Sequence, residues 1–283
     1  MENIQSIRSR INTVQNIQKA ATAMKLISTI KLAKLNTVPV ECIKDTINVL
    51  SNMMAIVAGE AIYNNEFYTN HWLLRKNGEI LLIVLSTDQG FCGSFKQSIL
   101  NTAEKFVSDH SDIYLELFGK KMGSLGQNVA EIKAERNIVS RDDVGGYART
   151  LQQIIFEYIK AWNVSDVYII SGEYVNAMTQ LPRCLKLFPL KINDATTFNK
   201  TDFNISKIEL FDWLFEKYLY SLCYNVVYEH LLAEMSVRVF SMDKTVRNAD
   251  DMSRDLTLLY NRTRQAKITQ ELTEIVASVE CIR

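Results

Sequence analysis

The sequence predicts an α/β protein in which long N- and C-terminal helices form an antiparallel coiled coil beside a central Rossmann-like α/β domain. Three observations predict this fold class. Apolar residues near both termini recur at three- and four-residue steps, the spacing of helices that wind around each other. All ten glycines lie between Gly59 and Gly172, so both ends nearly lack helix breakers. The middle alternates apolar runs with amphipathic stretches, as a parallel sheet covered by helices does.

The N-terminal region, residues 1–58, is predicted to be a coiled-coil helix. Its apolar seam begins with Ile4, Ile7, Ile11 and Val14. We expect the seam to slip by one position and to resume through Ile17, Ala20, Met24 and Ile27. The first 34 residues carry six basic side chains and one acid, Glu2. This charge indicates either a solvated helix or a helix that faces an acidic protein surface.

The central region, residues 59–205, is predicted to be the α/β domain with a small parallel sheet. The continuous apolar run at 79–87 is typical of a strand that is buried on both faces. The other expected elements are a helix from about Ser94 to Ser108, a strand over 112–119, a loop and helix over 142–162, and a strand over 166–174. Residues 183–190 can add a strand at the edge, since Pro189 argues against a central position.

The C-terminal region, residues 206–283, is predicted to be one very long helix. The segment "SKIE" at 206–209 is a capping box, and residues 190–283 contain neither glycine nor a further proline. A helix that runs to about Val279 is on the order of 100 Å long, more than a domain of this size can cover. A second seam lies within it: Met235, Val239, Met242, Val246, Ala249, Ser253, Leu256, Tyr260 and Thr263.

The two seams predict that the terminal helices pair with each other. The pairing is antiparallel if the central domain holds the inner ends of both helices. Two separate helices that bind other chains would show the same periodicity, so both interpretations remain open at this point. Beyond the seam, residues 262–273 are mostly polar. They form either an exposed tip or a surface with many directional hydrogen bonds, suited to meeting different partners in turn.

Composition narrows the functional classes. Lys plus Arg and Asp plus Glu both number 32, so no overall charge favours nucleic acid or a membrane surface. The five cysteines are scattered without a CxxC pair, which fits neither a zinc site nor a disulfide framework and indicates a reducing compartment. No run of about 18 apolar residues is present, so we expect no membrane-spanning helix.

The sharpest local feature is "STDQGFCGSF", Ser86 to Phe95. A strand, a glycine-containing turn and a helix can cradle a phosphate, but the GxGxxG and GxxxxGK[ST] spacings are missing. We favour the interpretation that Gly90 and Gly93 serve a tight turn and strand-to-helix packing. Cys92 could be a nucleophile at a helix N-terminus, yet no histidine shows a recognisable pairing with it. A structural cysteine is the favoured interpretation.

Other candidate groups are also interpreted as structural. His71, His110 and His230 lack the spacing of metal ligands. Asp142 and Asp143 precede two glycines and are expected to form a turn and a helix cap rather than an acid–base pair. We therefore expect no catalytic, cofactor-binding or metal-binding residue, and no enzyme activity of the chain by itself.

Three segments resemble the gamma subunit of F-type ATP synthase, and the likeness spans nearly the whole chain. "IRSRINTVQNIQKAATAMKLISTIKL" (7–32) is similar to the N-terminal helix of that family, and "LTLLYNRTRQAKITQELTEIVAS" (256–278) to its C-terminal signature. The turn "STDQGFCGSF" is similar to the family's central turn, with Thr87 added and Gln89 in place of arginine. Because the likeness starts at residue 4, the basic N-terminal helix is expected to belong to the mature chain.

The resemblance implies a central rotor shaft that couples proton flow to ATP synthesis or hydrolysis on beta subunits. The implied partners are the alpha3beta3 ring, the epsilon subunit and the c-ring, with no nucleic acid and no cofactor. The implied location is the cytoplasmic face of a bacterial inner membrane, with the mitochondrial matrix face as the alternative.

Six residues are carried over from the family by position. Arg264, Gln265 and Thr269 match positions that hydrogen-bond loops of the ring, and Met24, Lys25 and Arg238 match positions near an acidic region of beta. We hypothesise that Lys25 and Arg238 face these carboxylates. The rival interpretations are an α/β nucleotide-binding enzyme with helical dimerisation extensions, and a coiled-coil tether without rotation. A tether would keep its apolar seam to the end of the helix.

Overall fold

The computed structural model describes residues 4–63, 78–87, 89–110, 112–119, 132–136, 143–161, 164–176, 178–189 and 206–280. The chain divides into two compact units. We call Met1–Ile30 with Arg238–Arg283 the helical unit, and Lys31–Val237 the α/β unit. The three domains expected from the sequence, with limits at 58 and 205, stay predictions.

The α/β unit contains a sheet that, in the described residues, has five strands in the order β3-β2-β1-β4-β5. The strands are β1 (Glu79–Leu85), β2 (Ile113–Phe118), β3 (Ile132–Arg136), β4 (Val164–Tyr174) and β5 (Gln180–Phe188). The first four pair in parallel, and β5 pairs antiparallel with β4 at the edge. The predicted strands and the edge position of the last one are confirmed. Strand β3 was not predicted from the sequence.

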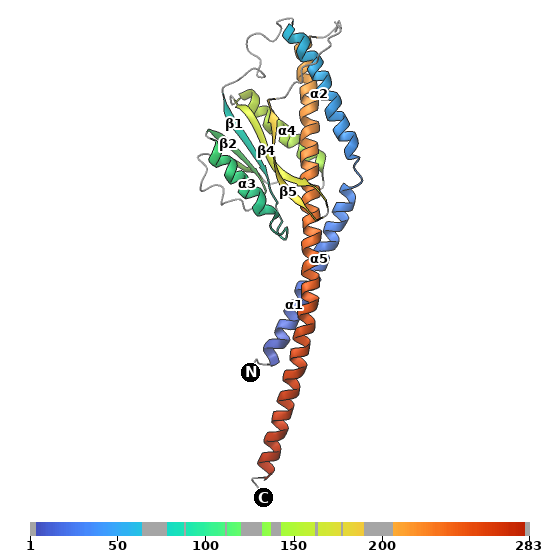
Figure 1. Cartoon of the computed structure of the whole chain (residues 1–283), viewed down its shortest axis with the longest axis vertical. Coiled ribbons are helices and arrows are strands. Elements are labelled where there is room, and N and C mark those ends of the chain that lie inside the picture. The colour runs from blue at the N-terminus through green and yellow to red at the C-terminus, as the bar shows by residue number, and fades with distance from the viewer. Residues whose placement is uncertain are drawn as a thin grey trace. The chain divides into compact units, whose positions relative to one another are not determined.

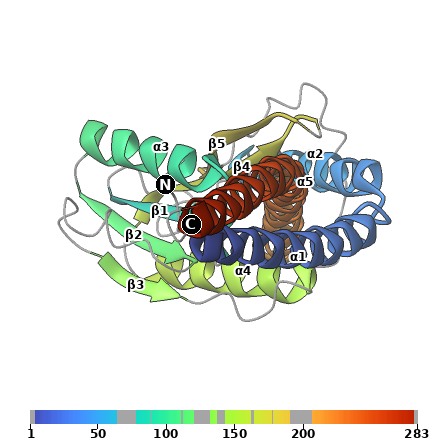
Figure 2. The ribbon, with the colours of Figure 1, turned by 90° about the horizontal axis from the view of Figure 1, so that it is seen from below.

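Helices cover both faces of this sheet. The sequence of β1 is uniformly apolar because both faces of the strand are buried. Leu81 and Ile83 pack into one core cluster and Leu82 packs into another, and all three are fully buried. Helix α4 (Val144–Ala161) and the first part of α5 contribute to the first cluster. Helix α3 (Phe95–Asp109) contributes to the second. Figure 2 shows α3 and α4 on opposite sides of the sheet.

The N-terminal region contains two helices, not the single helix expected over 1–58. Helix α1 spans Ile4–Leu35 and helix α2 spans Val40–Tyr63. Pro39 lies in the break, where it disfavours helical geometry in the preceding residue and lacks an N–H. Helix α2 packs into the first core cluster through Met54 and Val57. It therefore belongs to the α/β unit rather than to the coiled coil.

Helix α5 (Lys207–Glu280) has 74 residues, which confirms the long C-terminal helix. Within the α/β unit it buries large apolar side chains such as Phe211, Phe215 and Leu231. No helix in the described part of the chain is long and apolar enough to cross a membrane.

In the helical unit, α1 and α5 lie side by side and run antiparallel (Figure 1). The hydrogen bond of Gln18 to Asp250 and that of Lys25 to Asp243 show the direction, because the α5 number falls as the α1 number rises. The predicted α5 seam is confirmed. Met242, Ala249 and Leu256 are buried, and the seam positions between and after them, Val246, Ser253, Tyr260 and Thr263, are half-buried.

The predicted slip in the α1 seam is wrong. Burial repeats every seven residues without interruption, at Ile7, Val14, Ala21 and Ser28. Ile17 and Ile27, assigned to the seam from the sequence, are 49% and 52% exposed. The polar side chains of Gln18 and Lys25 occupy the seam instead, because each finds a carboxylate partner on α5.

Candidate functional site: the helical pair and its exposed tip

The end of α5 is uncovered. After half-buried Thr263, every residue from Arg264 to Ser278 is exposed. We call residues 264–278 the tip. Because the α1–α5 seam ends at this point, nothing in the helical unit covers the last turns among the described residues. The tip therefore presents all its faces to a partner.

The three predicted contact residues of the tip are available at its surface. Arg264, Gln265 and Thr269 are all exposed. The Thr269 hydroxyl donates to the Gln265 carbonyl at 2.9 Å, so its oxygen can still accept a hydrogen bond. Besides its polar residues, the tip carries exposed apolar side chains at helical spacing: Ile268, Leu272, Ile275 and Val276.

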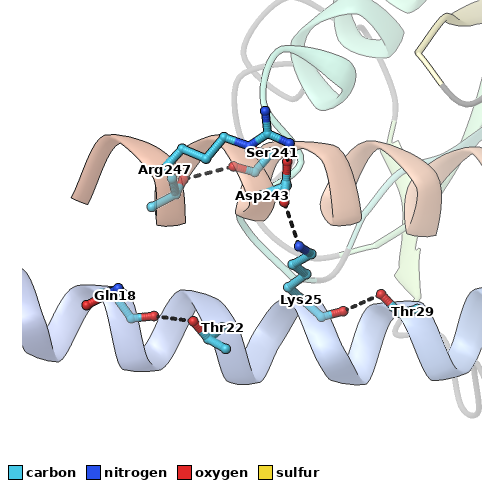
Figure 3. Close-up of polar contacts among 8 residues, drawn as sticks. Gln18, Thr22, Lys25, Thr29, Ser241, Asp243 and Arg247 are labelled. Atoms are coloured by element: carbon cyan, nitrogen blue, oxygen red, sulfur yellow. Dashed lines mark hydrogen bonds and ion pairs between the residues drawn. The ribbon is translucent and has the colours of Figure 1, made fainter. Parts of the chain in front are cut away.

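A cluster of three charges joins α1 to α5 (Figure 3). The Lys25 ammonium donates to Asp243 Oδ1 at 2.5 Å, and the Arg247 guanidinium lies 2.7 Å from Asp243 Oδ2. The pKa of the Asp243 carboxyl is lowered, mainly by the hydrogen bond from Lys25 and further by Arg247. Asp243 and Arg247 were not identified from the sequence. Their i,i+4 spacing was a visible signal, but their link to Lys25 spans 218 positions of the chain.

The remaining predicted contact residues differ in accessibility. Met24 is half-buried on α1, and the Lys25 side chain is 40% exposed beside its ion pair. Arg238 is only 1% exposed. Contact of these residues with a partner stays a prediction. For Arg238, such a contact requires its covering side chains to move.

The turn after β1 is a connection with its own internal bonds. Phe91 and Gly93 adopt positive φ angles of 67° and 53°, and a side chain at Gly90 would meet open space. Gly93 thus serves the tight turn, as predicted, whereas Gly90 is not needed for close packing. Cys92 is 4% exposed, and its sulfur lies 3.7 Å and 3.6 Å from the carbonyl oxygens of Gln89 and Gly90. This favours a structural role. Asp88 lies outside the described residues.

The crevice where sheets of this type bind ligands is filled. Such ligands lie beyond the carboxyl ends of the strands where the strand order reverses, which here is between β1 and β4. A Cβ on Gly172 of β4 would fall 2.2 Å from the Phe95 ring and 3.5 Å from the Ala233 side chain. The Gly172 N–H donates to Nδ1 of fully buried His230 at 3.1 Å. Side chains of α3 and α5 therefore fill the space beside Gly172 at this end of β4.

The other candidate groups also have structural partners. Asp143 Oδ1 accepts the Gly146 N–H at 3.0 Å, which confirms the predicted cap of α4, while Asp142 lies outside the described residues. The His110 ring lies 2.9 Å from the Phe106 carbonyl oxygen and stacks on the Phe106 ring. In the described residues, no group of three or more His, Cys, Asp or Glu side chains is placed to hold a metal ion. His71 lies outside them.

Comparisons with known proteins agree on one family. A family model described as ATP synthase matches residues 3–282. The chain is 30% identical to the ATP synthase gamma chain of Glaesserella parasuis over the full length of both, and 28% identical to that of Ruminiclostridium cellulolyticum over 99% of both. A chain of the Euglena gracilis mitochondrial ATP synthase (OSCP/F1/c-ring, rotational state 3) has the same fold, with a TM-score of 0.60, 15% identity and coverage of 99% of this chain and 95% of that one. The chain therefore belongs to the ATP synthase gamma chain family.

Proposed function

We propose that the chain is the central rotor shaft of an F1Fo ATP synthase and couples proton flow to ATP synthesis or hydrolysis on the beta subunits by rotation. The observation that carries this proposal is the tip. A helix that continues for several turns beyond its own seam, with every residue exposed, needs a surface around it. A related fold occurs in the rotor of the Euglena gracilis enzyme, at a TM-score of 0.59.

The proposed partners follow from this assignment. The helical unit stands within a ring of alpha and beta subunits, and the α/β unit contacts the epsilon subunit and the c-ring. The chain itself carries no reacting group. It acts by touching equivalent beta sites differently, so that its contacts shift each site toward another conformation. Because the curated relatives described above are bacterial, we place the complex at the cytoplasmic face of the inner membrane rather than at the mitochondrial matrix face.

Co-purification tests the proposal. The full chain, affinity-tagged and expressed in its own cells, should recover alpha, beta and epsilon subunits from membranes in a three-to-three-to-one ratio. Recovery of the chain alone would overturn it. Equilibrium binding of ATP to the isolated chain distinguishes the enzyme alternative, since the filled crevice between β1 and β4 predicts no binding.

The predicted tip contacts can be tested with matched controls. Gln265→Ala and Thr269→Ala should lower ATP-driven proton pumping in membrane vesicles while leaving the helicity of the isolated chain unchanged, because both side chains are exposed. Gln270→Ala and Thr273→Ala make the same chemical changes at neighbouring exposed positions. If the two pairs of variants pump equally well, the carried-over contacts are wrong.

A further inference from the structure

The exposed apolar side chains near the end of α5 belong to a second seam, separate from the one that faces α1. Its positions alternate three- and four-residue steps, the spacing of a coiled-coil interface. We call it the tip seam, and all of its residues are exposed: Leu258, Asn261, Gln265, Ile268, Leu272 and Ile275. The last turns of α5 extend beyond α1 (Figure 1), and no other described segment of the helical unit covers this seam. A helix of another molecule can therefore lie along it.

The charges along the tip seam are separated by sign. Three basic residues, Arg262, Arg264 and Lys267, come first, and the acidic residues Glu271 and Glu274 follow about one turn later. In two parallel copies of this helix, like charges would lie at the same level and repel each other. In two antiparallel copies, the basic part of each helix lies beside the acidic part of the other. The charge pattern therefore favours an antiparallel pair of identical helices.

One register of such a pair satisfies both the apolar and the charged residues. If a twofold axis passes through the middle of the tip seam, Leu258 of each copy faces Ile275 of the other. Arg264 of each copy then lies beside Glu271 of the other, which gives two identical ion pairs. Glu271 Oε1 lies 3.8 Å from Lys267 Nζ, and the Glu271 side chain is 59% exposed. Its carboxylate can therefore accept a further hydrogen bond from an arginine.

We propose that two copies of the free chain pair antiparallel through their tip seams, before another partner covers the tip. This timing rests on the proposed function, under which the alpha3beta3 ring covers the same surface in the assembled complex. The pair is weak and reversible, because the interface is short and two of its positions, Asn261 and Gln265, are polar. Pairing covers the apolar side chains of the tip in the free chain, and binding to the ring separates the two copies.

Analytical ultracentrifugation of the full chain at increasing concentration tests the pairing. The unaltered chain should sediment as a monomer at about 1 μM and as a dimer at about 100 μM. Leu272→Asp places a charge in the interface and should weaken dimerisation more than about tenfold, because each copy loses a buried leucine. Leu26→Asp makes the same change on α1, where the leucine is 61% exposed against 58% for Leu272, and should dimerise like the unaltered chain. Circular dichroism should show unchanged helicity in both variants.

A charge exchange tests the register of the pair. Arg264→Glu and Glu271→Arg each turn both ion pairs into like-charge contacts, so each variant alone should dimerise about threefold to tenfold less tightly at low salt. An equimolar mixture of the two variants restores two attractive pairs and should dimerise as tightly as the unaltered chain. A monomeric unaltered chain, equal effects of Leu272→Asp and Leu26→Asp, or no recovery in the mixture would overturn the inference. A monomeric chain that still recovers alpha and beta subunits from membranes would leave the proposed function intact.

Discussion

The two units of the chain use the same helix, α5, in opposite ways. In the α/β unit, α5 contributes side chains from Phe211 to Leu232 to a large apolar cluster shared with α2, α4 and the sheet. In the helical unit, the buried cluster contains Val14, Ala249 and Leu256, and the helices are also joined by polar bonds. The α/β unit can thus stabilise itself by burying apolar surface. The helical unit buries only a narrow seam and leaves most of its surface for partners.

The largest expected effect on stability comes from truncating one buried leucine to alanine in each unit. Leu81→Ala leaves a cavity in a closed core, so we expect the α/β unit to lose about 2–5 kcal/mol of unfolding free energy. Leu256→Ala lies in an open seam that water can fill, so only the transfer term of about 2 kcal/mol is lost. Urea unfolding measures both losses. Amide hydrogen exchange should become faster across the α/β unit in Leu81→Ala. In Leu256→Ala it should become faster only in α1 and α5 of the helical unit. Equal and global effects would contradict the division.

Overpacking tests the filled crevice of the α/β unit. Gly172→Ala places a methyl group against the Phe95 ring, which is buried, and should destabilise the unit by about 1–3 kcal/mol. Phe95→Leu shortens the opposing side chain, so the double variant should recover part of this loss. Thermal unfolding of the four chains gives the coupling between the two sites. Strictly additive effects would show that Phe95 does not fill the space beside Gly172.

A smaller effect is expected at the cap of α4. Asp143→Ala removes the acceptor for the Gly146 N–H and should cost about 1 kcal/mol. Asp143→Asn keeps an acceptor oxygen and serves as the control. Thermal unfolding should separate the two variants by a few degrees. If both variants unfold at the same temperature, the charge of Asp143 matters rather than its hydrogen bond.

The sequence predicted those parts of the fold whose cause is local. The burial of β1 is predictable because the residues on both of its faces are apolar. The α5 seam is predictable as far as Thr263 because apolar or small residues occupy most of its positions. Strand β3, with its short charged sequence "IKAER", carries no such signal. Its pairing is defined by β2, not by its own composition.

The prediction of the α1 seam was wrong for a related reason. Gln18 and Lys25 are held in the seam, only partly exposed, by carboxylates more than 200 positions away, so their polarity alone suggests full exposure. The apolar residues beside them were then assigned to the seam. Of the six predicted contact residues, those of the tip lie at the surface, whereas Arg238 does not. A match to a family position thus identifies the residue type, but it does not predict whether the side chain is buried.

The smallest expected effect compares one ion pair from each unit at acidic pH. In the α/β unit, Lys186 lies 2.6 Å from Asp166, and in the helical unit Lys25 binds Asp243. The pKa of Asp166 is lowered because, although burial raises it, the hydrogen bonds from Lys186 and Ser165 outweigh that effect. The pKa of Asp243 is lowered chiefly by Lys25. A carboxyl with a lower pKa in the folded chain stabilises it above its unfolded pKa of about 3.9, and this stabilisation is lost as the pH falls through the folded value.

Both units should therefore lose a little stability below about pH 4, and neither pair should cause a change between pH 5 and 8. The partly exposed Asp166–Lys186 pair is expected to contribute about 0.5 kcal/mol. Hydrogen exchange measured at each pH follows the stability of each unit. Asp166→Asn should reduce the loss of amide protection at acidic pH only in the α/β unit, and Asp243→Asn only in the helical unit. If one substitution reduced the pH dependence of amide protection in both units, the units would unfold together. A local ion pair cannot otherwise protect amides of the unit to which it does not belong.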